Sequence, residues 1–265
     1  MRPLRRIDGV FRTLHDALVG IQIDFSALRP TDFSKEDRDF AIAVWSDRVQ
    51  TEYRSVQIMT RFLTEVLGAG DPLDVYAGAV DAIADEVRHT ALCAAVVTAL
   101  GGVPPLPDPV VETENPAFMA LPMVERALGT AVSMLAVSET LSTGFIDDLR
   151  TRPNHPVIRA VLDATLADEE THHAFGWAYV EASLSRFDAA GRDFARQVVR
   201  VTLDPHEASA RRVLAGMRAD ERRLDAWPEP ELAWLGISSA ERQALVYRRV
   251  HDQTLQPRLA ALGLA

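Results

Sequence analysis

The sequence has little of several features that define common classes of protein. Its only cysteine is Cys93, which excludes an internal disulfide framework. No apolar run is long enough to span a membrane, and the basic residues 1–6 are not followed by the apolar core of a signal peptide. The net charge of −10 argues against a general nucleic-acid surface, because phosphate binding needs clustered Lys and Arg. We therefore expect a soluble, cytoplasmic protein with no nucleic-acid or membrane partner.

Four long segments have the periodicity of amphipathic helices. Apolar residues recur at steps of three and four over residues 35–67, 73–100, 123–149 and 158–183. Ser34 is placed to cap the first of these helices. The pattern predicts an all-α fold with a four-helix core over residues 35–184. The length of 265 residues and the hydrophobic content of 48% suit one large core, so we expect a single domain over residues 1–265.

The connection between the second and third helices is rich in proline. Proline occupies positions 104, 105, 107, 109, 116 and 122, so residues 101–122 are predicted to be extended rather than helical. About twenty extended residues reach roughly 65 Å, whereas a helix of about 28 residues is roughly 42 Å long. The connection is therefore long enough to cross the whole bundle, which would make the second and third helices parallel.

Accessory helices are predicted on both sides of the core. Residues 1–34 form an N-terminal extension with one short amphipathic helix, whose apolar residues are Phe11, Leu14, Leu18 and Ile21. Residues 185–265 predict C-terminal helices near 189–203 and 206–224. A final helix is expected to begin at a capping box formed by Ser238 and Glu241 and to end near Gln256-Pro257.

One hexapeptide frame, Ala-Asp-Glu-x-x-His, occurs twice. The copies are Ala84-Asp85-Glu86-Val87-Arg88-His89 and Ala167-Asp168-Glu169-Glu170-Thr171-His172. On a helix, Glu at position i and His at position i+3 project from the same face. Both pairs lie on the apolar stripe of their helix, so each copy offers one oxygen and one nitrogen ligand to the same point.

A lone glutamate interrupts the apolar stripe of the helix before each copy. Glu52 lies 34 residues before Glu86, and Glu139 lies 30 residues before Glu169. The two halves are offset by 87 residues for the lone glutamates and by 83 for the glutamates of the repeated frame. These nearly equal offsets indicate two related helical hairpins.

The predicted cluster needs compensating charge. Four carboxylates at one height of a bundle are very costly to bury unless cations or protons neutralise them. Two divalent ions would do so, and oxygen and nitrogen ligands suit iron or manganese, whereas a structural zinc site more typically uses several cysteines. A ligating histidine usually donates its second N–H to a carboxylate. We therefore expect Asp168 to orient His89, and Asp85 to orient His172.

The six residues carry a resemblance to a known family. A glutamate from each of two helices, with Glu-x-x-His from each of two others, is the ligand set of di-iron carboxylate bundles. Residues 35–184 thus resemble the ferritin-like superfamily of non-haem di-iron proteins through the metal ligands Glu52, Glu86, His89, Glu139, Glu169 and His172. The resemblance implies a ferritin-like four-helix bundle with a long crossover between helices 2 and 3. It also implies two iron ions, with Mn/Fe as an alternative pair.

The resemblance also implies an activity. True ferritins generally lack the second Glu-x-x-His, so the two histidines favour the oxygenase and oxidase branch. Such an enzyme uses dioxygen to oxidise a small organic substrate by hydroxylation, N-oxygenation, desaturation or oxidative cleavage. Arylamine N-oxygenases carry an additional histidine where this sequence has Thr165. The four glutamates would be the catalytic residues, a ferredoxin or another reductant would supply electrons, and the accessory helices would close the bundle or form a homodimer.

Several alternatives stay open from the sequence. A ferroxidase acting on ferrous iron and a metal-free interaction scaffold are the competing functions. A shifted frame, Glu170 with His173, has the same spacing as the second Glu-His pair. Cys93 and Tyr179 lie on the same stripes and are expected in the core, although Cys93 could also line a substrate pocket. Gly176 either leaves space for a substrate or allows close packing of two helices.

Overall fold

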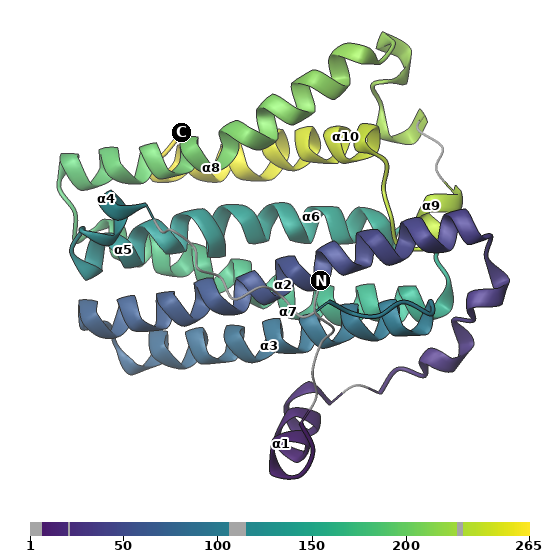
Figure 1. The fold of residues 1–265 in the computed structure, drawn as a ribbon. Coiled ribbons are helices and arrows are strands. Elements are labelled where there is room, and N and C mark those ends of the chain that lie inside the picture. The colour runs from purple at the N-terminus through teal and green to yellow at the C-terminus, as the bar shows by residue number, and fades with distance from the viewer. Residues whose placement is uncertain (1–6, 21, 106–114, 227–229) are drawn as a thin grey trace.

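The computed structural model is an all-α protein built of long, packed helices (Figure 1). It describes residues 7–20, 22–105, 115–226 and 230–265. Within these ranges, no helix is long and apolar enough to cross a lipid bilayer. The α-helices are α1 (Val10–Val19), α2 (Lys35–Ala69), α3 (Leu73–Ala99), α4 (Pro116–Met119), α5 (Met123–Thr130), α6 (Glu139–Arg150), α7 (Pro156–Leu184), α8 (Ala189–Gly216), α9 (Pro230–Trp234), α10 (Ala240–Val250) and α11 (Gln256–Leu262). Two π-helical segments, η3 (Ala131–Ser138) and η6 (His251–Leu255), join α5 to α6 and α10 to α11.

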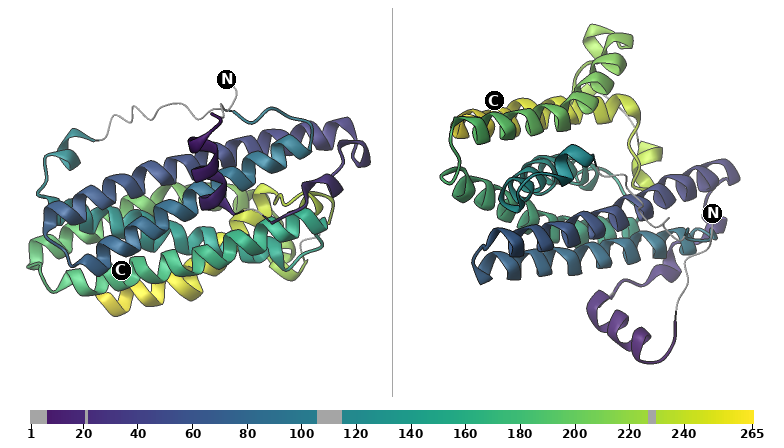
Figure 2. Two further views of the ribbon diagram at one scale, coloured as in Figure 1. Left: turned by 90° about the horizontal axis from the view of Figure 1, so that it is seen from below. Right: turned by 60° about the vertical axis from the view of Figure 1, so that its left-hand side comes forward.

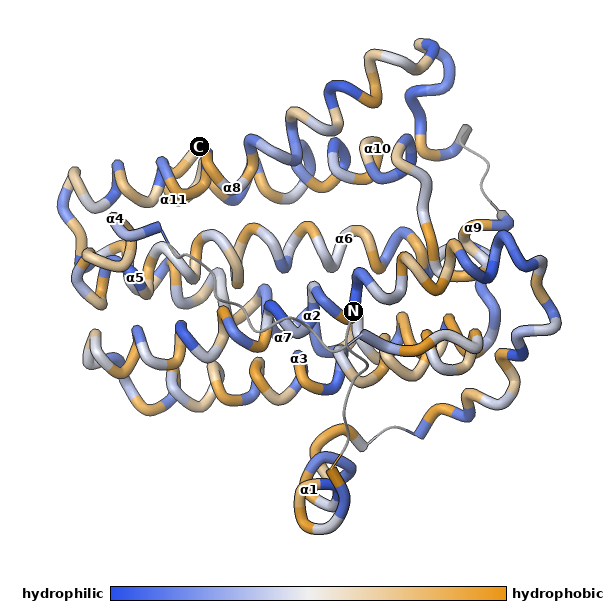
Figure 3. Tube along the Cα trace, in the orientation of Figure 1, coloured by the Kyte–Doolittle hydropathy of each residue, from blue (hydrophilic) through white to orange (hydrophobic). Residues whose placement is uncertain are grey.

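Four long helical elements enclose the core. α2 packs along α3 and against α5, while α7 packs against η3, α6 and α3. In Figure 1, α3 and the continuous element α5–η3–α6 run in one direction, and α2 and α7 run in the opposite direction. Residues 106–114 of the predicted crossover connection lie outside the described residues. Hydrophobic and polar residues alternate at helical spacing along the long helices (Figure 3), as the sequence pattern predicts.

The starts and ends of α2 follow from local chemistry. The hydroxyl of Ser34 accepts a hydrogen bond from the backbone N–H of Asp37 at 3.1 Å, which confirms the predicted N-terminal cap. Gly70 ends the helix in the left-handed region, with φ of 73°, where a side chain would be strained.

Two predictions about proline are wrong. The sequence predicts no helix within residues 101–122, but α4 begins there at Pro116. Proline is well tolerated in the first turn of a helix, because the backbone N–H that it lacks would have no partner within the helix there. The side chain of Asn115 caps the helix by accepting a hydrogen bond from the N–H of Ala117. Likewise, α8 is one helix across the two predicted segments, with Pro205 inside it. α8 bends in Figure 1, so the proline distorts the helix without ending it.

The last predicted helix differs at both ends. Ser239, not Ser238, caps α10, because its hydroxyl accepts from the N–H of Arg242 at 3.2 Å. The helix then continues past Pro257 to Leu262 through the π-helical segment η6. A proline clashes with the carbonyl four residues before it, and a wider π turn moves that carbonyl away.

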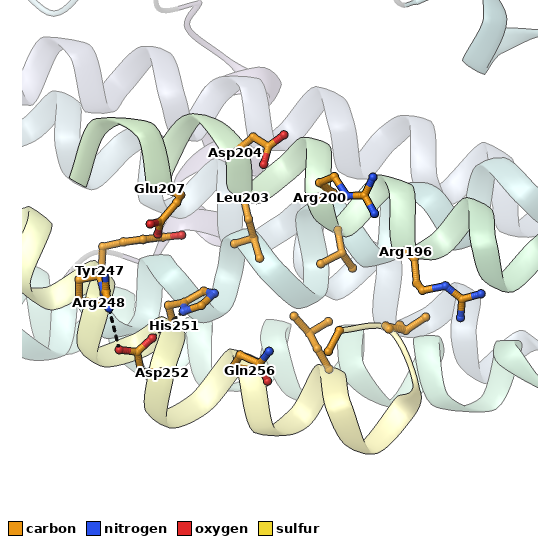
Figure 4. A pocket seen from close by; sticks show the side chains of 14 residues that line it. Arg196, Arg200, Leu203, Asp204, Glu207, Tyr247, Arg248, His251, Asp252 and Gln256 are labelled. Carbon is orange, nitrogen blue, oxygen red and sulfur yellow. Dashed lines mark hydrogen bonds and ion pairs between the residues drawn. The ribbon is translucent and has the colours of Figure 1, made fainter. Parts of the chain in front are cut away.

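The C-terminal helices pack on the core as a further layer (Figure 2). α10 contacts both α6 and α8. Arg242 fixes this layer, because its Nε donates to Asp148 Oδ2 at 2.6 Å and its Nη2 donates to Asp148 Oδ1 at 2.9 Å, with both side chains buried. A cavity of about 420 Å³ lies between α8 and the C-terminal helices, and Figure 4 shows its charged rim. None of the six predicted ligands lines it.

Gly176 allows close packing rather than space for a substrate. A Cβ atom at this position of α7 would lie 2.4 Å from the backbone C and O atoms of Leu135 in η3. Backbone atoms cannot move aside as the end of a flexible side chain can. The glycine is therefore required for α7 to lie directly against the π-helical segment.

We expect Gly176→Ala to destabilise the protein by about 1–3 kcal/mol, the range typical of overpacked cores. The measurement is urea-induced unfolding of the metal-free protein. Gly216→Ala is the matched control, since a Cβ at the end of α8 would meet no atom within 4 Å. Equal effects of the two substitutions would contradict the packing role of Gly176.

Candidate metal centre

The six residues predicted from the sequence come together in the middle of the four long elements. α2 provides Glu52, α3 provides Glu86 and His89, α6 provides Glu139, and α7 provides Glu169 and His172. They lie between two separate apolar clusters of the core. On α2, for example, Val49 belongs to one cluster and Met59 to the other. The polar site thus interrupts an otherwise apolar interior.

The ligand atoms form two overlapping groups, each with all its atoms within 4.8 Å of one another. The first group contains Glu52, Glu86, His89 and Glu169, and the second contains Glu86, Glu139, Glu169 and His172. Glu86 and Glu169 therefore belong to both groups. Each group has three carboxylates and one imidazole, which is a donor set suited to iron or manganese.

The two histidines present the same atom to the centre. Nδ1 of His89 lies 3.6 Å from Glu86 Oε2 and 3.8 Å from both Glu52 Oε2 and Glu169 Oε1. Nδ1 of His172 lies 3.6 Å from Glu86 Oε1 and 3.8 Å from Glu169 Oε2. These distances are too long for hydrogen bonds, but they suit atoms that share a cation between them.

Five buried polar atoms at this centre have no hydrogen-bond partner. They are Glu86 Oε2, His89 Nδ1, Glu139 Oε1, Glu169 Oε2 and His172 Nδ1. Leaving one such group unsatisfied costs about 1–3 kcal/mol, and more if it is charged. Five unsatisfied atoms at one place indicate that a binding partner belongs between them, and two divalent cations would satisfy all five. The residues therefore fit a two-metal site.

Burial also changes the proton affinity of the site. It raises the pKa of Glu86 and of Glu139 to about 8, and neighbouring carboxylates add to the effect. Burial and the adjacent Glu139 raise the pKa of Glu169 well above its usual value. Burial alone would lower the pKa of His89, but its interactions with Asp168 and Glu86 outweigh this and raise that pKa. Without metal, the centre therefore holds protons at neutral pH.

The two predicted Asp–His pairs are present, and they cross between helices. Nε2 of His89 on α3 lies 3.2 Å from Oδ2 of Asp168 on α7, and Nε2 of His172 lies 3.1 Å from Oδ2 of Asp85. Each aspartate thus contacts the ring nitrogen that faces away from the centre. This leaves Nδ1 of both rings directed at the carboxylates.

Arg88 completes this arrangement and was not predicted. Its Nη1 donates to Asp85 Oδ1 at 2.5 Å and to Asp168 Oδ2 at 2.7 Å. One guanidinium therefore joins the aspartates of both repeated frames. Although Asp168 is partly buried, its contacts with His89 and Arg88 lower its pKa and keep it ionised. The only sequence signal is the i,i+3 spacing from Asp85 to Arg88.

We expect Asp168→Asn to weaken metal binding about 10- to 100-fold, because an amide orients His89 less well than a carboxylate does. Competition with a chelator of known affinity measures the change. Asp81→Asn on the exposed face of α3 is the control for a lost negative charge. Unchanged affinity in Asp168→Asn would show that the contact with His89 does not support a metal site.

The remaining candidates lie outside the two groups. Glu170 is exposed, and half-buried His173 contacts the backbone carbonyl of Glu169 at 3.1 Å, so the shifted frame does not form a site. Cys93 is buried one turn beyond His89, as expected for a core residue. The hydroxyl of Tyr179 donates to Asp71 at 2.7 Å, where it joins the end of α2 to α7.

Comparisons with known proteins assign no family to the chain. No protein-family model matches it, and neither the curated proteins nor the solved structures include a significant match. The geometry of the site is therefore the main indication of what the protein does.

Proposed function

We propose that this protein is a non-haem di-iron oxidoreductase with a ferritin-like bundle, which uses dioxygen to oxidise a small organic substrate. The observation that carries the proposal is the set of five buried ligand atoms without hydrogen-bond partners. A metal-free scaffold has no reason to keep this unfavourable arrangement at the middle of its core. The parallel course of α3 and α6 in Figure 1 supports the ferritin-like connectivity.

The two groups of ligands support a role for each residue. Glu86 and Glu169, which belong to both groups, would help to hold both metals. Glu52 and His89 would complete one metal site, and Glu139 and His172 the other. Four carboxylates balance the charge of two divalent ions, and six protein residues leave coordination positions open for small molecules.

The chain also provides the surroundings that this chemistry needs. When bound, an iron pair supplies electrons to dioxygen, and an external reductant such as a ferredoxin would restore them. The four glutamates would hold the metals and supply the negative charge that balances them. Arg88, Asp85 and Asp168 hold the two imidazoles in place. The two apolar clusters on either side limit the access of bulk water to the centre.

The deciding experiment is metal analysis of protein purified from iron-supplemented cells, followed by an anaerobic Fe(II) titration. We expect saturation at two irons per chain, one for each group of ligands. Exposure of this form to dioxygen should then produce a transient absorption change in the near-visible range. A protein that takes up no iron would overturn the proposal.

A further inference from the structure

Solvent reaches the candidate metal centre at Glu52. The Glu52 side chain is 20% exposed, whereas the side chains of Glu86, His89, Glu169 and His172 are at most 3% exposed. Glu139 is also buried, so the five ligands other than Glu52 are enclosed by the helices. A substrate that approaches the centre from solvent therefore meets Glu52 and its neighbours on α2 first.

Arg48 lies one helical turn before Glu52, on the same face of α2. Its Nη2 donates to the backbone carbonyl of Gly236 at 2.8 Å, and its guanidinium lies 4.3 Å from the centre of the Trp45 ring. Trp45 itself donates to the carbonyl of Leu235 at 2.9 Å. The guanidinium is therefore held in a fixed position beside the open edge of the centre.

The charge of Arg48 is poorly compensated. Among the described residues, no carboxylate oxygen lies within 4 Å of its guanidinium, including the carboxylate of Glu52. Burial lowers the pKa of Arg48, and Cys93 and Glu52 only partly oppose that effect. Arg88, another arginine next to the site, contacts two aspartates. A half-buried cation without a counter-ion is unfavourable, so its position calls for an anion from outside the chain.

The donors of the guanidinium that make no contact within the chain suit an oxyanion such as a carboxylate. The planar group has five N–H donors and pairs with a carboxylate through two parallel hydrogen bonds. The carbonyl of Gly236 takes a donor of one nitrogen only, which leaves the others for a ligand. The interior next to the guanidinium is apolar, since Val49 and Cys93 are buried in the same cluster as Trp45.

We propose that Arg48 binds the carboxylate of the organic substrate, which is therefore a small organic acid with an apolar body. The bound carboxylate places the rest of the molecule at the edge of the centre next to Glu52. This inference rests on the proposed function and names the substrate class of the same site. Arg48 acts in recognition, and it is not one of the metal ligands.

The test compares acids with their neutral amides on the Zn²⁺-loaded protein, in which no turnover occurs. Titration calorimetry with benzoate and hexanoate, and with benzamide and hexanamide, measures the preference for a carboxylate. We expect at least one acid to bind at least about tenfold more tightly than its amide. Arg48→Gln should raise the Kd of that acid about 10- to 100-fold and leave the Kd of the amide unchanged.

The controls separate recognition from folding and from metal binding. Arg48→Gln removes the charge and leaves the metal ligands unchanged, and Arg48→Lys keeps the charge but loses the planar arrangement of donors. Arg48→Lys should therefore weaken acid binding to an intermediate degree. Arg54→Gln removes the same charge from an exposed position of α2 and should change nothing. Equal binding of acids and amides, or equal acid binding in wild type and Arg48→Gln, would overturn the inference. Failure to load metal would instead overturn the proposed function.

Discussion

Glu86→Ala is expected to remove both metals, whereas Glu52→Ala is expected to leave one. Glu86 belongs to both groups of ligands, so its loss deprives each metal of a carboxylate. Glu52 belongs to the first group only, and the group of Glu86, Glu139, Glu169 and His172 stays complete without it. We expect the affinity of Glu86→Ala for iron to fall more than about 100-fold, beyond the usual effect of a residue that only supports a ligand. Elemental analysis after dialysis against a weak chelator gives the stoichiometry.

Glu170→Ala provides the matched control for this experiment. Glu170 follows the shared ligand Glu169 directly but is exposed, so two metals per chain should remain. Loss of metal in this variant would support the shifted pair of Glu170 and His173. Equal stoichiometry in Glu86→Ala and Glu52→Ala would show that the two groups are not two sites with shared ligands.

The clustering of the six candidate residues could be predicted from the sequence because the geometry of an α-helix is regular. Its period fixes which side chains share a face, so a glutamate on an apolar stripe must point into the core. Glu52 and Glu139 each occupy such a position, and Glu86 with His89 repeats at Glu169 with His172. The aspartate before each glutamate of the repeated frame also allowed the contacts of Asp168 with His89 and of Asp85 with His172 to be predicted.

Arg88 could not be assigned in the same way. It lies off the apolar stripe, where an arginine is usually a solvated surface residue. Its role depends on Asp168, which is 80 residues away in the sequence and reaches Arg88 only because α3 packs against α7. The periodicity of a sequence shows which residues share a face of one helix, but it does not show which other helix packs against that face.

The π-helical segment η3 was missed for a related reason. Its residues, Ala131–Ser138, continue the apolar pattern on both sides, so nothing in the sequence marks a change of hydrogen-bonding period. The hydroxyl of Ser138 donates to the carbonyl of Ser133, five residues back. Glu139 follows at once as the first residue of α6. π-Helical turns are frequent at functional sites, and this one lies directly before a proposed ligand.

Metal binding is expected to release protons from the centre at neutral pH. Because burial raises the pKa of Glu86 and Glu139 to about 8, both carboxyl groups are mostly protonated at pH 7 in the metal-free protein. Metal ligation needs the ionised form, so about two protons per chain should leave from these groups alone. Calorimetric titration of Fe(II) in buffers of different ionisation enthalpy counts them. The number should decrease at pH 9, where both groups are already ionised.

The same pKa values set how the stability of the metal-free protein depends on pH. The usual pKa of a glutamate is 4.5, so between about pH 4.5 and pH 8 the folded protein holds more protons at Glu86 and Glu139 than the unfolded chain does. The free energy of unfolding should therefore fall as the pH rises through this range. Glu139→Gln cannot ionise, so it should make the metal-free protein more stable at pH 8 and flatten the decline. Glu170→Gln, at an exposed position, should leave the decline unchanged. A free energy of unfolding that rose between pH 5 and pH 8 would contradict this prediction. The buried carboxyl groups would then be ionised and compensated by other groups of the chain, and they would not require a metal.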